Sequence, residues 1–288
     1  LDCANHYGDR VAAWEIWNEP DISFTMDDET ADQYAAVLKA AAIGFRDSGY
    51  SPLISMAGLA NTPDEYGDLM MENDILPFID IYNFHRHRTY RQAGADTTFP
   101  EGVKEHRQFR DQYNGQDKPM WLTEAGIGIL SAPPAELTYE EQTVQARYMV
   151  TSSITSLSQG VDKHFMFVLP PYQEGDLYWG MFGRDCTPYA SYAATAALTD
   201  AIGEGEYTGE LNNLPDAVTG YTFRDGSDSV IVLWSSSETK VSLSFNASEV
   251  TLIDMMGRKQ TLDPEGKEYQ VQVSPDPVYL RYKGHELP

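Results

Sequence analysis

Two glutamates stand at the ends of short apolar segments and could act together on one substrate. Glu19 follows the apolar run 14–17 and precedes Pro20, which cannot extend a strand and turns the chain. Glu124 closes a second apolar run, residues 120–123. Because the carboxyl ends of parallel strands meet at the mouth of a barrel, both side chains are expected at one site.

Such a pair of carboxyl groups can hydrolyse a glycosidic bond. When the two groups stand about 5 to 5.5 Å apart, one attacks the anomeric carbon and the other serves first as acid and then as base. Partial burial of Glu19 against Trp14 and Trp17 would help to keep that acid protonated. The alternative interpretation is two unrelated surface acids in turns.

Basic residues gather between the two glutamates, in a chain whose formal charge is −24. The cluster comprises His85, Arg86, His87, Arg88 and Arg91. Arginine forms bidentate pairs with carboxylate and sulfate groups, so the cluster could bind a uronic or sulfated sugar. The alternative is a set of salt bridges to the abundant acidic residues nearby.

The segment from residue 11 to 203 alternates short apolar runs with longer amphipathic runs. The predicted strands are residues 11–17, 52–57, 79–84, 120–123 and 164–169, and the predicted helices are residues 28–48, 64–73, 102–113, 139–159 and 190–202. Thr138 and Glu141 form a capping box that places the start of the fourth helix. The alternation predicts an α/β fold with parallel strands joined by right-handed crossovers.

Short β-rich runs replace the helical pattern after Gly203. The predicted strands there are residues 217–223, 230–234, 241–245, 250–254, 269–273 and 278–282. Short strands separated by turn residues are typical of a small antiparallel β-sandwich. We therefore expect two domains, 1–203 and 204–288.

Composition limits the kinds of partner. With 20 Lys+Arg against 44 Asp+Glu, the chain lacks the basic face that a nucleic-acid-binding protein needs. No apolar run reaches the roughly 20 residues of a membrane-spanning helix. The 42% of hydrophobic residues predicts a folded core. The two cysteines, Cys3 and Cys186, are interpreted as free thiols because they are too few for a disulfide framework.

The run Glu-Ile-Trp-Asn-Glu-Pro-Asp at residues 15–21, together with Leu-Thr-Glu at residues 122–124, resembles the retaining glycoside hydrolases of clan A. The resemblance is closest to the β-xylosidase and α-L-iduronidase family and its relatives, and it covers residues 5–203. It implies a (β/α)8 TIM barrel in which Glu19 is the acid/base, Glu124 is the nucleophile and Asn18 binds the sugar 2-hydroxyl. It also implies an oligo- or polysaccharide substrate and neither a metal nor a cofactor.

Other positions match the family's site less closely. His85 corresponds to a histidine on the family's sixth strand, whereas His87 stands where a tyrosine that contacts the nucleophile is usual. The run 164–169 has phenylalanine where relatives often have a sugar-stacking tryptophan. The aromatic residues that could contact the sugar instead are Trp17, Tyr172, Tyr178 and Trp179. The alternative for those after residue 169 is a small core within the loop.

The resemblance places residues 11–17 on the fourth strand of the barrel. Three strand–helix units, roughly 95 residues, are then expected upstream, so the chain is interpreted as the carboxy-terminal part of a longer enzyme. A secreted or periplasmic location would follow if that upstream part began with a signal peptide. The alternative from another class is a non-catalytic carbohydrate-binding or scaffold protein built on a half barrel, which would have no need for two strand-end glutamates.

Overall fold

The computed structural model describes residues 1–22, 30–90, 99–130, 136–266, 268–284 and 286–288. Their contacts separate the chain into two compact units. The first unit holds Leu1–Arg88, Gly94–Ala125 and Gln159–Met166, and the second holds Thr89–Ala93, Gly126–Ser158 and Phe167–Pro288. Both strand-end glutamates, Glu19 and Glu124, belong to the first unit.

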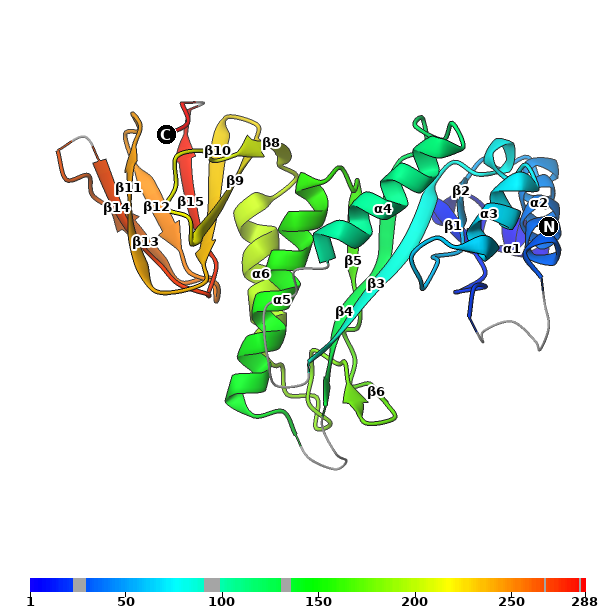
Figure 1. Cartoon of the computed structure of the whole chain (residues 1–288), viewed down its shortest axis with the longest axis horizontal. Coiled ribbons are helices and arrows are strands. Elements are labelled where there is room, and N and C mark those ends of the chain that lie inside the picture. Colours follow the sequence, from blue (N-terminus) through cyan, green and yellow to red (C-terminus); the bar gives the residue numbers. More distant parts are fainter. Residues whose placement is uncertain (23–29, 91–98, 131–135, 267, 285) are drawn as a thin grey trace. The chain divides into compact units, whose positions relative to one another are not determined.

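Five strands run through the first unit in chain order, and they belong to two sheets that isolated bridges connect (Figure 1). They are β1 (Ala13–Ile16), β2 (Leu53–Met56), β3 (Tyr82–Tyr90), β4 (Met120–Leu130) and β5 (Lys163–Met166). β1 and β2 pair in parallel. Two isolated parallel bridges, Ser55 with Ile81 and Leu59 with Phe84, connect the region of β2 with the region of β3. β4 pairs with β3 on one side and, in parallel, with β5 on the other. Each strand therefore neighbours the next strand along the chain, as the alternating pattern predicts.

Helices alternate with these strands. The helices of the first unit are α1 (Asp2–Tyr7), α2 (Ala31–Asp47), α3 (Glu65–Glu72) and α4 (Phe99–Gln112), with short 3-10 turns at Gly8–Arg10 and Leu76–Phe78. α2 begins at a capping box, in which the backbone N–H of Thr30 donates to the Gln33 side chain. Among the residues that the structure describes, no helix is both long and apolar enough to cross a membrane.

The strands at the candidate site differ in their limits from the prediction. β3 starts later than expected and continues past Phe84 to Tyr90, so the basic residues 85–88 are part of the strand and not of a loop. β4 likewise continues to Leu130. Because successive side chains of a strand point to opposite faces, the longer β3 divides its basic residues between two faces.

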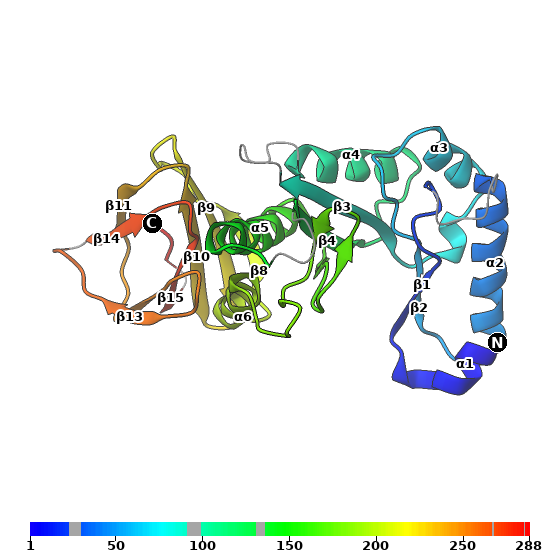
Figure 2. The same cartoon turned by 90° about the horizontal axis from the view of Figure 1, so that it is seen from below.

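The second unit contains α5 (Tyr139–Ser158) and α6 (Ala190–Ile202), which lie side by side in both views (Figures 1 and 2). The predicted capping box of α5 is confirmed. The backbone N–H of Thr138 donates to Glu141 Oε2 at 2.7 Å, and the N–H of Glu141 donates to Thr138 Oγ1 at 3.3 Å. A short hairpin of β6 (Gln173–Glu174) and β7 (Leu177–Tyr178) pairs with the end of β4.

Two antiparallel sheets complete the second unit and form the predicted β-sandwich. The strands are β8 (Glu206–Glu210), β9 (Val218–Asp225), β10 (Asp228–Ser235), β11 (Thr239–Ser244), β12 (Val250–Ile253), β13 (Lys259–Leu262), β14 (Glu268–Val273) and β15 (Val278–Lys283). One sheet has the order β13-β12-β15-β10-β9-β8 and the other is the pair β11-β14. Apolar side chains from both sheets, such as Ile231, Val271 and Leu280, form one buried core.

Polar contacts join the two helices to the six-stranded sheet. Arg281 on β15 donates to Asp225 and Asp228 and to the carbonyl oxygens of Asp200 and Ala201 at the end of α6. Helices α5 and α6 and the sandwich therefore belong to one compact unit, and the expected domain boundary after residue 203 lies inside it.

Candidate active site

Glu19 lies in a tight turn that follows β1. Trp17 and Glu19 both have positive φ angles, 77° and 41°, a region that non-glycine residues rarely adopt. Asp21 holds the turn in place by accepting the backbone N–H groups of Ala60 and Asn61 at 3.0 and 2.9 Å. Glu19 is consequently buried, at 7% exposure, even though it lies outside regular structure.

A close backbone approach sets the position of His85 on β3. A Cβ atom at Gly58 would lie 2.1 Å from the His85 ring, so only glycine leaves room for the imidazole there. The N–H of Gly58 also donates to Glu15 Oε1 at 2.9 Å. The loop after β2 thereby fixes both a histidine and a carboxylate at the site.

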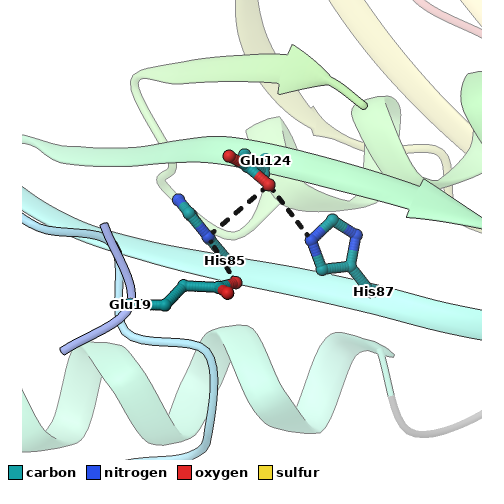
Figure 3. A group of neighbouring side chains, drawn as sticks. All are labelled: Glu19, His85, His87 and Glu124. Atoms are coloured by element: carbon teal, nitrogen blue, oxygen red, sulfur yellow. Dashed lines mark hydrogen bonds and ion pairs between the residues drawn. The ribbon is translucent and has the colours of Figure 1, made fainter. Parts of the chain in front are cut away.

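His85 lies between the carboxylates of Glu19, in the turn after β1, and Glu124, which lies within β4 (Figure 3). Its Nδ1 is 2.8 Å from Glu19 Oε1 and 3.8 Å from Glu124 Oε2, and its Nε2 is 3.1 Å from the hydroxyl of Thr123. That hydroxyl donates to Asn83 Oδ1 at 2.9 Å, so its oxygen accepts from Nε2–H. Nε2 therefore carries a proton in the neutral ring, and Nδ1 carries one towards Glu19 only when the ring is charged.

Nearby acids keep His85 charged at neutral pH. Burial by itself would lower the pKa of His85, but the attraction of Glu15 and Glu19, together with the charge of Glu124, outweighs burial and raises that pKa to about 9. Glu15 Oε1 lies 3.7 Å from Nε2, too far for a hydrogen bond, so its effect is that of a nearby charge. The result is one imidazolium surrounded by three carboxylates.

His87 contacts Glu124 from the same face of β3. Its Nε2 lies 3.4 Å from Glu124 Oε2, and its ring centroid is 6.2 Å from that of His85. One donor atom from each of Glu19, His85, His87 and Glu124 lies within 4.8 Å of the other three. The structure thus brings together four residues that the sequence analysis selected.

Arg86 lies on the face of β3 opposite to His85 and His87, which corrects the expectation that the basic residues form one cationic patch at the site. The Arg86 guanidinium lies against Gly102 of α4, where a Cβ atom would come within 2.6 Å of its Cζ. The neighbouring His106 stacks on Phe84 and has its pKa lowered to about 3, first by burial and then by the charge of Arg86. Arg88, two residues further along β3, lies on the same strand face as Arg86. Arg91 lies outside the described residues.

Of the expected sugar contacts in the first unit, Asn18 is half-buried beside Glu19 and Trp17 is 51% exposed. Tyr172, in the second unit, is 40% exposed and meets Phe167 edge to face. Trp179 is only 6% exposed, and its ring packs against Phe167 and Gly128. The core alternative therefore describes Trp179, which offers no open ring face for stacking, while Trp17 and Tyr172 remain accessible.

Three polar residues at the site were not selected from the sequence. Glu15, Asn83 and Thr123 all belong to the hydrogen-bonded or charged surroundings of His85. The two-residue period of a strand is the signal that would have found Asn83, because it shares a face with His85 and His87. The position of Glu15 depends on Gly58, which only the fold brings near.

Comparison with known proteins indicates the fold. No family model and no curated protein matches the chain. A family 39 glycoside hydrolase from the gut symbiont Bacteroides cellulosilyticus WH2 superposes with a TM-score of 0.72 at 18% identity over 98% of this chain. A glucosidase from Croceicoccus marinus and a GH30 endoxylanase from Clostridium papyrosolvens C71 give TM-scores of 0.68 and 0.64, at 14% and 13% identity over 96% and 99% of the chain.

The chain spans part of each of these structures, 60% of the family 39 enzyme, 69% of the glucosidase and 68% of the endoxylanase. Family 39, family 30 and family 51 enzymes are clan A glycoside hydrolases. The chain therefore shares its fold with part of these glycoside hydrolase structures, and it combines α/β segments with a β-sandwich. At this identity the likeness concerns the fold and leaves the substrate open.

Proposed function

We propose that this protein is a retaining glycoside hydrolase in which Glu19 is the acid/base and Glu124 is the nucleophile. The observation that carries the proposal is the separation of their carboxylates, whose nearest oxygens lie within 4.8 Å of each other. Retaining pairs stand about 5 to 5.5 Å apart, whereas inverting pairs stand about 6.5 to 9.5 Å apart to admit a water molecule. The short separation of Glu19 and Glu124 supports a retaining mechanism.

Each carboxylate then has one task in each of two steps. In the first, Glu124 bonds to the anomeric carbon while Glu19 gives its proton to the leaving oxygen, and the glycosidic bond breaks. In the second, Glu19 takes a proton from water, the water oxygen bonds to the anomeric carbon, and the ester to Glu124 breaks. Charged His85 would pass its Nδ1 proton to Glu19 Oε1, 2.8 Å away, for delivery to the leaving oxygen, and the proton that Glu19 takes from water would return to Nδ1.

The charge around the pair favours a neutral sugar. The expectation of a uronic or sulfated substrate depended on Arg86 and Arg88, and the strand face of these arginines is turned towards α4. Around His85 three carboxylates face one imidazolium, an excess of negative charge that would repel an acidic sugar. We expect higher kcat/KM for neutral aryl glycosides than for the matching uronides. A preference for the uronide that is lost in Arg86→Ala would restore the original hypothesis.

Product stereochemistry tests the mechanism. The assay should use the whole natural gene product, because the chain spans 60% of the length of the family 39 structure. Aryl glycosides of both anomeric configurations are incubated with the protein, and proton NMR records the first hemiacetal released. Retained configuration is expected, while inverted configuration would exclude a glycosyl-enzyme on Glu124. Saccharide binding with no turnover would instead favour the non-catalytic alternative.

A further inference from the structure

The four side chains at the site also match the donor set of a metal ion. Two imidazoles and two carboxylates converge from β3, β4 and the turn after β1, and their donor atoms lie within 4.8 Å of one another (Figure 3). In tetrahedral zinc sites, bonds of about 2.0 to 2.2 Å place neighbouring ligand atoms about 3.3 to 3.6 Å apart. His87 Nε2 and His85 Nδ1 are 3.4 and 3.8 Å from Glu124 Oε2, so small side-chain shifts would suffice.

The hydrogen bonds behind His85 orient it as a ligand. Its Nε2–H donates to Thr123, whose own proton goes to Asn83, and the amide nitrogen of Asn83 donates to the carbonyl of Met56 at 3.4 Å. This chain of donors keeps a proton on Nε2 when the ring is neutral, so the lone pair is on Nδ1, the atom that faces both glutamates. An ion would replace the proton that Nδ1 shares with Glu19.

The ligand types select the class of ion. Imidazole nitrogens suit zinc, cobalt, nickel and copper, whereas magnesium and calcium prefer sites made of oxygen atoms. The excess of carboxylates around His85 adds attraction for a divalent cation. His87 supplies the second imidazole, and without it the donor set would hold one imidazole and two carboxylates.

We propose that Glu19, His85, His87 and Glu124 bind one divalent transition-metal ion such as Zn²⁺, and that the bound ion blocks the site. An ion held by both glutamates leaves neither carboxylate available for attack or proton transfer. If the protein hydrolyses glycosides, zinc should inhibit it reversibly and a chelator should restore the rate. The binding itself does not depend on the proposed hydrolysis and is measured separately.

Zinc binding is measured in a background that lacks the two exposed thiols. Cys3 and Cys186 are exposed and could bind zinc by themselves, and Cys3 is three residues from His6 on α1. The parent for this test is therefore the Cys3→Ser/Cys186→Ser protein. Competition with a chromogenic chelator gives the zinc dissociation constant and the stoichiometry, and Co²⁺ in place of zinc reports tetrahedral geometry by its visible spectrum.

We expect one ion per chain in the parent, with no competition from a large excess of Mg²⁺. His87→Gln removes a direct ligand whose side chain is 26% exposed, and it should weaken binding by at least the roughly 10- to 100-fold that loss of an outer-shell partner of a ligand costs. His6→Gln is the matched control and should leave the dissociation constant unchanged. Glu124→Gln is a second test of the same set. Thermal unfolding of each metal-free variant establishes that it is folded.

Two results would overturn the proposal. One is a parent that binds no zinc, and the other is a folded His87→Gln protein with the parent's affinity within about twofold. Hydrolysis without zinc binding would leave the proposed function intact and reject the ion. Zinc binding without hydrolysis would support the metal site and reject the proposed function.

Discussion

At the scale of single residues, the function proposed here depends on one shared imidazole. His85 contacts Glu19 at 2.8 Å and Glu124 at 3.8 Å, so the two carboxylates are held by the same ring. A charged His85 would stabilise negative charge on either carboxylate during the two steps of a double displacement. The predictions at this scale therefore concern Glu19 and His85.

Replacing Glu19 should impair the reaction according to the leaving group. General acid catalysis contributes about 10²- to 10⁴-fold, so Glu19→Ala should lose that much kcat/KM on glycosides of poor leaving groups. On activated aryl glycosides, whose aryl group leaves without protonation, kcat/KM should fall far less. Glu140→Gln, an exposed glutamate on α5, is the control. Equal losses on both kinds of substrate would argue against Glu19 as the acid.

The raised pKa of His85 predicts a pH-dependent stability. Because the folded pKa of about 9 is above the usual 6.5, the stabilisation is fully present below pH 6.5 and is lost as the pH rises through 9. The difference in urea midpoint between the natural protein and His85→Gln should therefore shrink between these values. His6→Gln, on exposed α1, should show no such trend. A difference independent of pH would mean that His85 acts by packing alone.

At the scale of elements, most helices and strands could be predicted from their apolar period and caps. The helix α6 has the predicted limits, and α5 begins at the predicted box of Thr138 and Glu141. β8 and β13 were missed because they are the edge strands of the six-stranded sheet and carry polar, exposed residues with little apolar period. β3 was cut short because its basic residues interrupt the apolar run.

One glycine between elements determines whether the site can form. In Gly58→Ala the added methyl would meet the His85 ring at 2.1 Å, so the ring must move or the loop must shift. Overpacking of this kind costs about 1 to 3 kcal/mol, and displacement of His85 should also lower kcat. Chemical denaturation and steady-state kinetics measure the two effects.

Gly44→Ala on α2 is the matched control, since its nearest neighbour to a new Cβ is 3.5 Å away and alanine favours a helix. That variant should be as stable as the natural protein or more so. If Gly58→Ala kept both the stability and the kcat of the natural protein, the close approach of Gly58 to His85 would not be needed for the site.

At the scale of the whole molecule, the chain is divided by contacts and not by the change in sequence pattern. The pattern changes from helical to β-rich after residue 203, but α5, α6 and the sandwich form one compact unit. Arg281 explains part of this, because it connects two aspartates of the sheet with the last carbonyl groups of α6. The apolar period of a segment cannot predict a contact between residues as far apart in the sequence as Arg281 and Ala201.

Arg281→Lys should weaken the second unit although it keeps the charge. Lysine lacks the planar fork that reaches several acceptors at once, and losing charge-assisted hydrogen bonds costs about 1.5 to 3 kcal/mol. We expect a lower thermal midpoint and faster proteolysis of the sandwich. Arg258→Lys, whose side chain is 84% exposed, should change neither. Equal behaviour of the two variants would show that α6 and the sheet are held by apolar packing alone.

The sequence by itself determined the alternation of strands and helices between residues 11 and 203 and the choice of Glu19 and Glu124 as candidates. These follow from apolar period, capping residues and proline, which act over a few neighbouring positions. Only the tertiary structure decided which basic residues meet Glu19 and Glu124. Two neighbouring basic residues, His85 and Arg86, are separated by the sheet because strand alternation directs their side chains to opposite faces. The resulting four-residue site depends on distances between segments that no local pattern specifies.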